Sequence, residues 1–358
     1  MRGPTERWRR VRPTLESVAE EAGVSRQTVS NVLNAPHLVS DQTRRRVEAV
    51  IARTGYRPVK AAQTLRTRRS FLIAIGLHAS PAEGGGEVES RFLHALSERA
   101  QLRGYRTLLY TAEDDDAEIG TCESLLREYD LDGFVLTGTH AGDERTAWLE
   151  QREIPFVTFG RPWGAASRHC WVDVDGASGV RAATRHLIGL GHHSIAFLGW
   201  PEGSGVGEDR RAGWEAACRE AALPTDGLVL HMTNSFAAGR SACAQLLLAA
   251  SPPTAFVCVS DVIALGALSE LTTRGLEPGS EAAVIGFDDS TAAALAGLSS
   301  VRQPLDDVAS ACLDCLDKLQ APRGTRDETP DTVLLQPRLV LRNSATSPAR
   351  PAGCAEDP

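Results

Sequence analysis

The sequence predicts an all-α helix-turn-helix domain followed by an α/β core of two doubly wound parallel-sheet subdomains. Short amphipathic helices with capping residues occupy residues 13–58. Apolar runs then alternate with amphipathic helical stretches from Phe71 to about residue 343. Such alternation is typical of doubly wound parallel sheets, and the length of this region favours two of them.

Charge is distributed unevenly along the chain. The net charge of all 358 residues is −8, yet residues 1–70 hold 15 Lys and Arg against 6 Asp and Glu. The remaining residues therefore carry an excess of 17 negative charges. A basic head on an acidic body is expected when one small domain contacts phosphates. A solvated basic tail would explain residues 1–12, but not the arginines of the patterned segment that follows.

Composition excludes several other classes. With 42% hydrophobic and 23% charged residues the chain has the composition of a globular protein. It contains no apolar run of about 18 residues, so we expect no membrane span, and no apolar stretch follows the basic N-terminus as in a secretory signal. We therefore expect a cytoplasmic protein that keeps its eight cysteines as thiols. Cys312 and Cys315 share one predicted helix face and favour packing; neither a metal site nor a cofactor is expected.

Three short helices are expected near the N-terminus. Thr14 can cap a helix with apolar residues at helical spacing, and Gly23 permits a tight turn. Ser25 can cap a second helix, Arg26 to Asn34, and Ser40 a third, Asp41 to Arg53. Two helices joined by a Gly-containing turn define a helix-turn-helix.

The second of these helices is predicted to read DNA bases. Its first residues, Arg26, Gln27 and Thr28, would enter the major groove. Arg pairs with guanine and Gln with adenine in bidentate fashion, and Thr can contact a thymine methyl or a phosphate. Taken alone, these are equally well solvated helix positions; the turn and the charge imbalance favour base contact.

The same residues resemble the lactose/galactose-repressor family of bacterial regulators. The match comprises Thr14-Leu15, Val18-Ala19, Ala22-Gly23-Val24-Ser25, Thr28-Val29-Ser30, Val32-Leu33-Asn34, Val39-Ser40, Thr43-Arg44, Val47, Gly55-Tyr56 and Pro58. The resemblance implies that Ser25, Asn34, His37, Ser40 and Thr43 approach backbone phosphates. Asn31 stands where many members carry Arg. The DNA-contacting set also includes Thr14.

Residues 59–65 look like the hinge helix of this family, although a plain linker is the alternative. The resemblance implies that paired hinge helices form on DNA and that Leu65 inserts into the minor groove, with Ala62 facing DNA or the other hinge. A homodimer on a palindromic double-stranded operator is expected, because one turn motif reads too few bases.

The core matches the same family over several motifs and resembles a periplasmic-binding-protein type fold. The motifs include Asp173-Val174-Asp175-Gly176, Arg210-Arg211-Ala212-Gly213-Trp214, Asp261 with Ala264-Leu265-Gly266-Ala267, and Ile285-Gly286-Phe287-Asp288-Asp289. The resemblance implies that Arg210 and Asp288 hold the hydroxyls of a sugar-like effector in a cleft, with Asp261 nearby. Phe159, Trp163, Trp171 and Trp200 lie near predicted cleft loops, where an aromatic face suits the apolar side of a sugar. For each aromatic, core packing is the alternative.

These observations give the following division of the chain. We expect a basic tail at 1–12, the DNA-binding domain at 13–58, a hinge and linker at 59–70, a core at 71–343 and a flexible tail at 344–358. Within the core, the N-subdomain is predicted over about 71–161 and 303–327, and the C-subdomain over about 163–300 and 330–343.

Two other function classes fit less well. A nucleotide-binding α/β enzyme is suggested by Gly203-Ser204-Gly205-Val206-Gly207, but Glu208 stands where the third glycine of a dinucleotide motif is needed. No other catalytic motif accompanies it, so no enzyme is expected. A transport binding protein would share the core but should lack residues 14–65.

Overall fold

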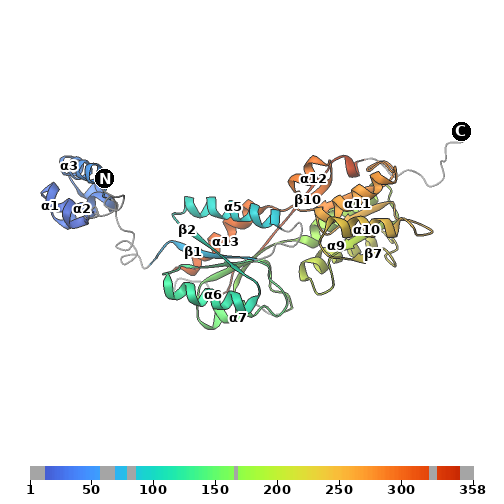
Figure 1. The fold of residues 1–358 in the computed structure, drawn as a ribbon, viewed down its shortest axis with the longest axis horizontal. Helices are drawn as coiled ribbons and strands as arrows, with labels where there is room; N and C mark the ends of the chain where they lie inside the picture. The colour runs from blue at the N-terminus through green and yellow to red at the C-terminus, as the bar shows by residue number, and fades with distance from the viewer. Residues whose placement is uncertain (1–12, 57–68, 79–85, 165–167, 322–328, 347–358) are drawn as a thin grey trace, which may run out of the picture. The chain divides into compact units, whose positions relative to one another are not determined.

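The computed structural model describes residues 13–56, 69–78, 86–164, 168–321 and 329–346. The chain divides into two units, residues 1–70 and residues 71–358. The first unit is helical and the second contains two six-stranded sheets, so the predicted fold class is confirmed (Figure 1). No helix within the described ranges is long and apolar enough to cross a membrane.

The first unit is a three-helix domain built by local capping. Thr14 accepts a hydrogen bond from the Ser17 amide, and Gly23 ends the first helix in the left-handed conformation, at φ 62°. A glycine suits this position because a side chain there would be strained. The elements are α1 (Leu15–Ala22), α2 (Arg26–Asn34), a short 3-10 helix (Pro36–Leu38) and α3 (Asp41–Thr54). Their shared core contains the fully buried side chains of Val18, Val29 and Val47.

The first sheet of the second unit is entirely parallel, in the order β11-β5-β4-β3-β1-β2. Its strands are β1 (Leu72–His78), β2 (Arg106–Ala112), β3 (Gly133–Leu136), β4 (Phe156–Phe159), β5 (Cys170–Val174) and β11 (Thr332–Leu335). Helices α5 (Gly86–Leu102) and α13 (Leu305–Leu319) share one core with this sheet. Helices α6 (Asp115–Glu128) and α7 (Glu144–Gln151) cover the other face (Figure 1).

The second sheet has the order β12-β10-β9-β8-β6-β7, with only the β10–β12 pair antiparallel. Its strands are β6 (Ile195–Gly199), β7 (Val229–His231), β8 (Ala255–Cys258), β9 (Ala283–Phe287), β10 (Ser299–Arg302) and β12 (Arg338–Val340). The helices are α8 (Gly176–Gly189), α9 (Gly205–Glu220), α10 (Phe236–Leu246), α11 (Asp261–Thr273) and α12 (Thr291–Leu295). Helix α8 packs on α9, and α10 on α11.

The predicted subdomain boundaries need correction. We expected 163–300 and 330–343 in the C-subdomain, but β5 pairs with β4, and β11 with β5, in the first sheet. The chain therefore crosses between the sheets after Val174, after Arg302 and after Leu335. The reason for the error is physical: a buried parallel strand has the same apolar pattern in either sheet.

The expected tail from residue 344 also begins too early. Asn343–Ala345 form a 3-10 helix whose Ser344 and Ala345 are buried. The Ser344 hydroxyl donates to the Val284 carbonyl at 2.6 Å and accepts from the Ser299 amide at 2.8 Å. Ser344 and Ala345 thus belong to the core, because their small side chains fit against the second sheet there.

Candidate functional site

The exposed start of α2 is the candidate DNA interface. Arg26 and Gln27 open this helix and both are exposed. The Arg26 guanidinium contacts Glu16 at 2.8 Å, with both side chains about two-thirds exposed (68% and 66%). Gln27 donates to the side-chain oxygen of Asn31 at 2.9 Å. Exposed pairs of this kind contribute little to stability, so both side chains can be redirected toward DNA at small cost.

Hydroxyl side chains mark the helix N-termini of the same unit. Ser25 caps α2 and bonds the Thr28 hydroxyl at 2.9 Å, and Ser40 caps α3 and donates to the Thr43 hydroxyl at 3.0 Å. Helix N-termini of this kind suit phosphate oxygens. His37 is exposed in the 3-10 helix. The side chain of Asn34, together with Ala62 and Leu65, lies outside the described residues.

A cavity of about 390 Å³ in the second unit is the candidate effector site. The cavity is lined by residues at or just after the ends of β3, β4 and β5 in the first sheet. Residues of α5 and of the first turns of α9 also contribute to the lining. Three predicted residues, Phe159, Trp163 and Arg210, line this cavity. The lining residues are Val88, Glu89, Phe92, Thr137, Gly138, Thr139, Phe159, Gly160, Trp163, Asp173, Val174, Gly176, Val206, Asp209, Arg210 and Gln303.

Arg210 is a buried arginine that contacts residues at the ends of strands of the second sheet. It lies in the second turn of α9, which begins at Gly205. Its guanidinium donates to the Val259 carbonyl at 2.6 Å, lies 3.9 Å from the Asp288 carboxylate and covers the Phe287 ring at 3.6 Å. Burial lowers the pKa of Arg210, and the charge of Asp288 opposes that shift.

Asp288 and Asp261 are not among the residues that line the cavity. Asp288 accepts from the Gln303 amide at 2.8 Å, and burial raises its pKa to about 6. Its backbone has φ 111°, which is uncommon for a non-glycine residue. Asp261 accepts from the Ser290 amide and the Ser300 hydroxyl. Burial and then the charge of Asp288 raise the pKa of Asp261 to about 7.

The predicted aromatic residues have different surroundings. Phe159 stacks on Phe92, with ring centroids 4.6 Å apart. Trp200 is not among the residues that line the cavity, and its ring centroid lies 5.2 Å from the guanidinium carbon of Arg210. Trp163 lies against Gly205, the first residue of α9: a Cβ at Gly205 would come within 2.2 Å of the indole ring. Part of the Trp163 ring is therefore already covered by protein.

Several lining residues were not predicted as site residues. Arg161 joins two acidic lining residues, with 2.6 Å to Asp173 and 3.4 Å to Asp209. Gly138 and Asp173 lie at or near the ends of buried strands, and the strand-end rule could have found them. Glu89 and Phe92 come from α5, and nothing in the local pattern marks them.

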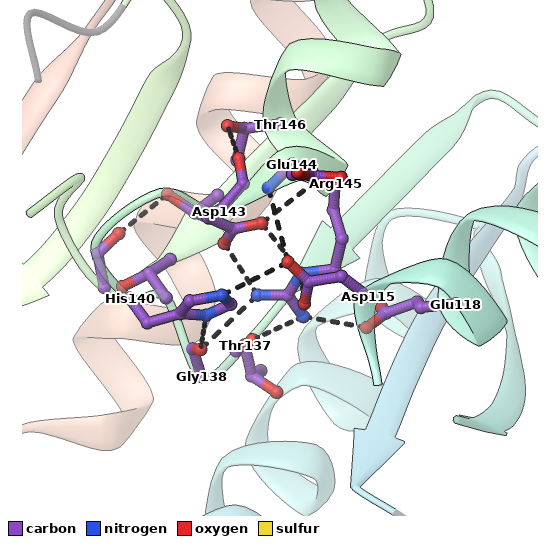
Figure 2. A network of polar contacts seen from close by, with 12 residues as sticks. Asp115, Glu118, Thr137, Gly138, His140, Asp143, Glu144, Arg145 and Thr146 are labelled. Carbon is purple, nitrogen blue, oxygen red and sulfur yellow. Dashed lines mark hydrogen bonds and ion pairs between the residues drawn. The ribbon is translucent and has the colours of Figure 1, made fainter. Parts of the chain in front are cut away.

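A polar network around the buried Arg145 contacts the backbone of Thr137 and Gly138, two residues that line the cavity (Figure 2). Arg145 donates to the carbonyl oxygens of Thr137 and Gly138, and it contacts Asp143 and Glu118 at 2.7 Å each. Side-chain atoms of Asp115, His140 and Asp143 lie within 4.8 Å of one another, a spacing seen in metal sites. The Arg145 guanidinium lies among these groups and supplies positive charge there (Figure 2).

Comparison with known proteins matches both units. Residues 14–59 match a family described as bacterial regulatory proteins, lacI family, and residues 184–345 match a periplasmic binding protein-like domain. The chain is 34% identical to the HTH-type transcriptional regulator CelR of Thermobifida fusca over 348 residues, covering 94% of this chain and 99% of that one. It is 33% identical to the regulator AglR of Rhizobium meliloti, covering 77% of each chain.

Solved structures agree with these relatives. A lac repressor dimer bound to operator has a TM-score of 0.78 at 26% identity, covering 93% of this chain and 99% of that one. A complex of the regulator CelR with cellobiose has a TM-score of 0.67 at 29% identity, covering 93% and 100%. A LacI-family regulatory protein from Chloroflexus aggregans has a TM-score of 0.72 at 34% identity, covering 77% and 99%.

Proposed function

Because the chain belongs to the lacI family of bacterial regulatory proteins, we propose that it represses transcription as a homodimer on a palindromic DNA operator, under the control of a sugar-like effector. The observation that carries this proposal is the cavity of about 390 Å³, where Phe159 and Trp163 adjoin Arg210. Ligand sites of this size commonly combine aromatic walls with a few polar groups. No catalytic role is proposed, and we expect the protein in the cytoplasm, where its operator is.

DNA recognition is assigned to the first unit. Arg26 and Gln27 are proposed to contact bases, with Thr28 and Asn31 beside them on the same helix. Thr14, Ser25, Asn34, His37, Ser40 and Thr43 are proposed to approach phosphates. Ala62 and Leu65 are proposed to act in the hinge, at the minor groove. The related lac repressor structure, a dimer bound to operator, supports this arrangement.

Effector control is assigned to the second unit. Phe159, Trp163 and Arg210 are proposed to contact the effector, with Trp200, Asp261 and Asp288 holding Arg210 and its surroundings in place. The related CelR structure contains cellobiose, which makes neutral disaccharides the first probes.

The test combines operator selection with ligand titration. The purified full chain selects its operator from random double-stranded DNA, and neutral disaccharides are then titrated into the complex. We expect enrichment of a palindrome and a change in operator affinity of at least about tenfold, or ~1.4 kcal/mol, with one of the sugars. Enrichment of no sequence would contradict the DNA-binding part of the proposal.

A further inference from the structure

Negative charge exceeds positive charge around the cavity. Among its described lining residues, Glu89, Asp173 and Asp209 carry carboxylates, whereas Arg210 is the one guanidinium. Arg161 lies beside the cavity but is held by Asp173 and Asp209. Arg210 is likewise engaged, by the Val259 carbonyl and Asp288. An anionic ligand would therefore meet carboxylates without an uncommitted cation to balance its charge.

Two covered donors belong to side chains that line this cavity. The indole Nε1 of Trp163 and the Nε of Arg210 have no hydrogen-bond partner among the described residues. Leaving buried donors without acceptors is costly, so an acceptor from a ligand would be favourable. A hydroxyl group can accept from such a donor and also donate to a carboxylate. The donors and carboxylates together match a polyhydroxylated molecule.

Gly205 determines how Trp163 is placed. A Cβ at Gly205 would come within 2.2 Å of Cδ2 and 2.4 Å of Cγ of the Trp163 ring. Real side chains cannot approach so closely, so any other residue at position 205 would displace the indole. The Arg161 guanidinium carbon also lies over this ring, 5.0 Å from its centroid. Gly205 and Arg161 thus occupy part of the ring face, and we assign the indole edge with its N–H to ligand binding.

We propose that the cavity selects an uncharged, polyhydroxylated ligand, and that Gly205 is a positioning residue that holds Trp163 so that its indole N–H, covered and without a partner among the described residues, donates to a ligand hydroxyl. This inference rests on the proposed effector-binding function of the same cavity. It assigns Gly205, in the glycine-rich segment Gly203–Gly207, to effector recognition. It also gives Trp163 the role of an edge donor in place of a stacking surface.

The charge part of the proposal is tested with matched sugars. Cellobiose, maltose and lactose are each titrated calorimetrically into the full chain beside the corresponding aldonic acid, in which the reducing carbon is oxidised to a carboxylate and its ring is open. At least one neutral sugar should bind about tenfold or more tightly than its acid. An acid that binds as tightly as its neutral partner would overturn the charge inference and leave sugar sensing intact. Binding of none of the six compounds would count against the proposed sugar-sensing function itself.

The positioning part is tested with Gly205→Ala. Its matched control is Gly120→Ala, in α6, where an added Cβ meets nothing within 4 Å. Affinity for the neutral sugar should fall at least about tenfold in Gly205→Ala and stay unchanged in Gly120→Ala. Operator binding without sugar should be normal in both, which verifies folding. Normal sugar affinity in Gly205→Ala would refute the positioning role.

Trp163→Phe provides a second variant that keeps an aromatic ring against Gly205 but removes the N–H. Loss of one hydrogen bond should weaken binding of the neutral sugar by about 2- to 13-fold. Unchanged affinity in this variant would refute the edge-donor role.

Discussion

Replacing Arg210 with Met is expected to show how much the charge of Arg210, as distinct from its packing, stabilises the wall of the effector cavity. Met retains apolar contact with Phe287 and Trp200 but removes the guanidinium that contacts both rings. Two interactions disappear: the hydrogen bond to the Val259 carbonyl at 2.6 Å and the 3.9 Å contact with Asp288. Among the described residues, Asp288 then keeps the hydrogen bond from the Gln303 amide, but its buried carboxylate has lost its main counter-charge.

The magnitude follows from these two losses. A hydrogen bond to a charged group contributes about 1.5–3 kcal/mol. Breaking a buried ion pair costs roughly 3–5 kcal/mol, and the long contact to Asp288 places this pair at or below the lower end. We therefore expect Arg210→Met to lower the free energy of unfolding by about 3 kcal/mol. In the double variant Arg210→Met/Asp288→Asn the loss should be smaller than the sum of the single losses by about 1–2 kcal/mol, since no unbalanced charge remains.

The assay is urea unfolding of the natural chain, of Arg210→Met, of Asp288→Asn and of the double variant. Unfolding is monitored by tryptophan fluorescence at pH 7.5. Operator affinity, measured in parallel, reports on the separate helical unit. Single losses that add within about 0.5 kcal/mol would refute the reasoning, because they would show that Arg210 and Asp288 do not interact.

The remaining predictions concern other parts of the chain. Arg26→Ala and Gln27→Ala should each cost about 1–3 kcal/mol on the selected operator and relax one base preference per half-site; equal losses on random DNA would show phosphate contact instead. Because burial raises the pKa of Asp261 to about 7, the native chain retains a proton that the unfolded chain releases above about pH 4. This group should therefore lower stability by about 1.4 kcal/mol per pH unit between those values, and Asp261→Asn should remove that slope in urea unfolding at pH 5, 6 and 7. An identical slope in both proteins would exclude that contribution. Arg145→Met should weaken sugar binding through the loop at Thr137 and Gly138, and unchanged affinity would show that the network in Figure 2 does not support the cavity.

Local signals explain what the sequence predicted well. The helices of the first unit begin directly after Thr14, Ser25 and Ser40, because each of these side chains accepts a hydrogen bond from a backbone amide three residues later. The alternation of apolar runs with amphipathic stretches predicted the α/β class of the second unit. Sheet membership of β5 and β11 could not be predicted in this way, since it depends on pairing between distant segments.

The candidate cavity was only partly predictable for the same reason. Arg210 and Phe159 belong to family motifs or strand ends, where the open-sheet rule places ligands. Glu89 reaches the cavity from α5, which packs against α13, more than 200 residues later in the chain. The placement of the Trp163 ring depends on the absence of a side chain at Gly205, a steric relation between residues that no local pattern encodes.

The central claim is that a neutral sugar in the cavity controls operator binding, and one measurement tests it most directly. Operator affinity of the full chain is measured by fluorescence anisotropy with and without the neutral disaccharide that binds best, in the natural chain and in Gly205→Ala. We predict that the sugar changes operator affinity at least about tenfold in the natural chain, and that Gly205→Ala needs at least tenfold more sugar for the same change. A sugar that binds the natural chain but leaves its operator affinity unchanged would contradict the account.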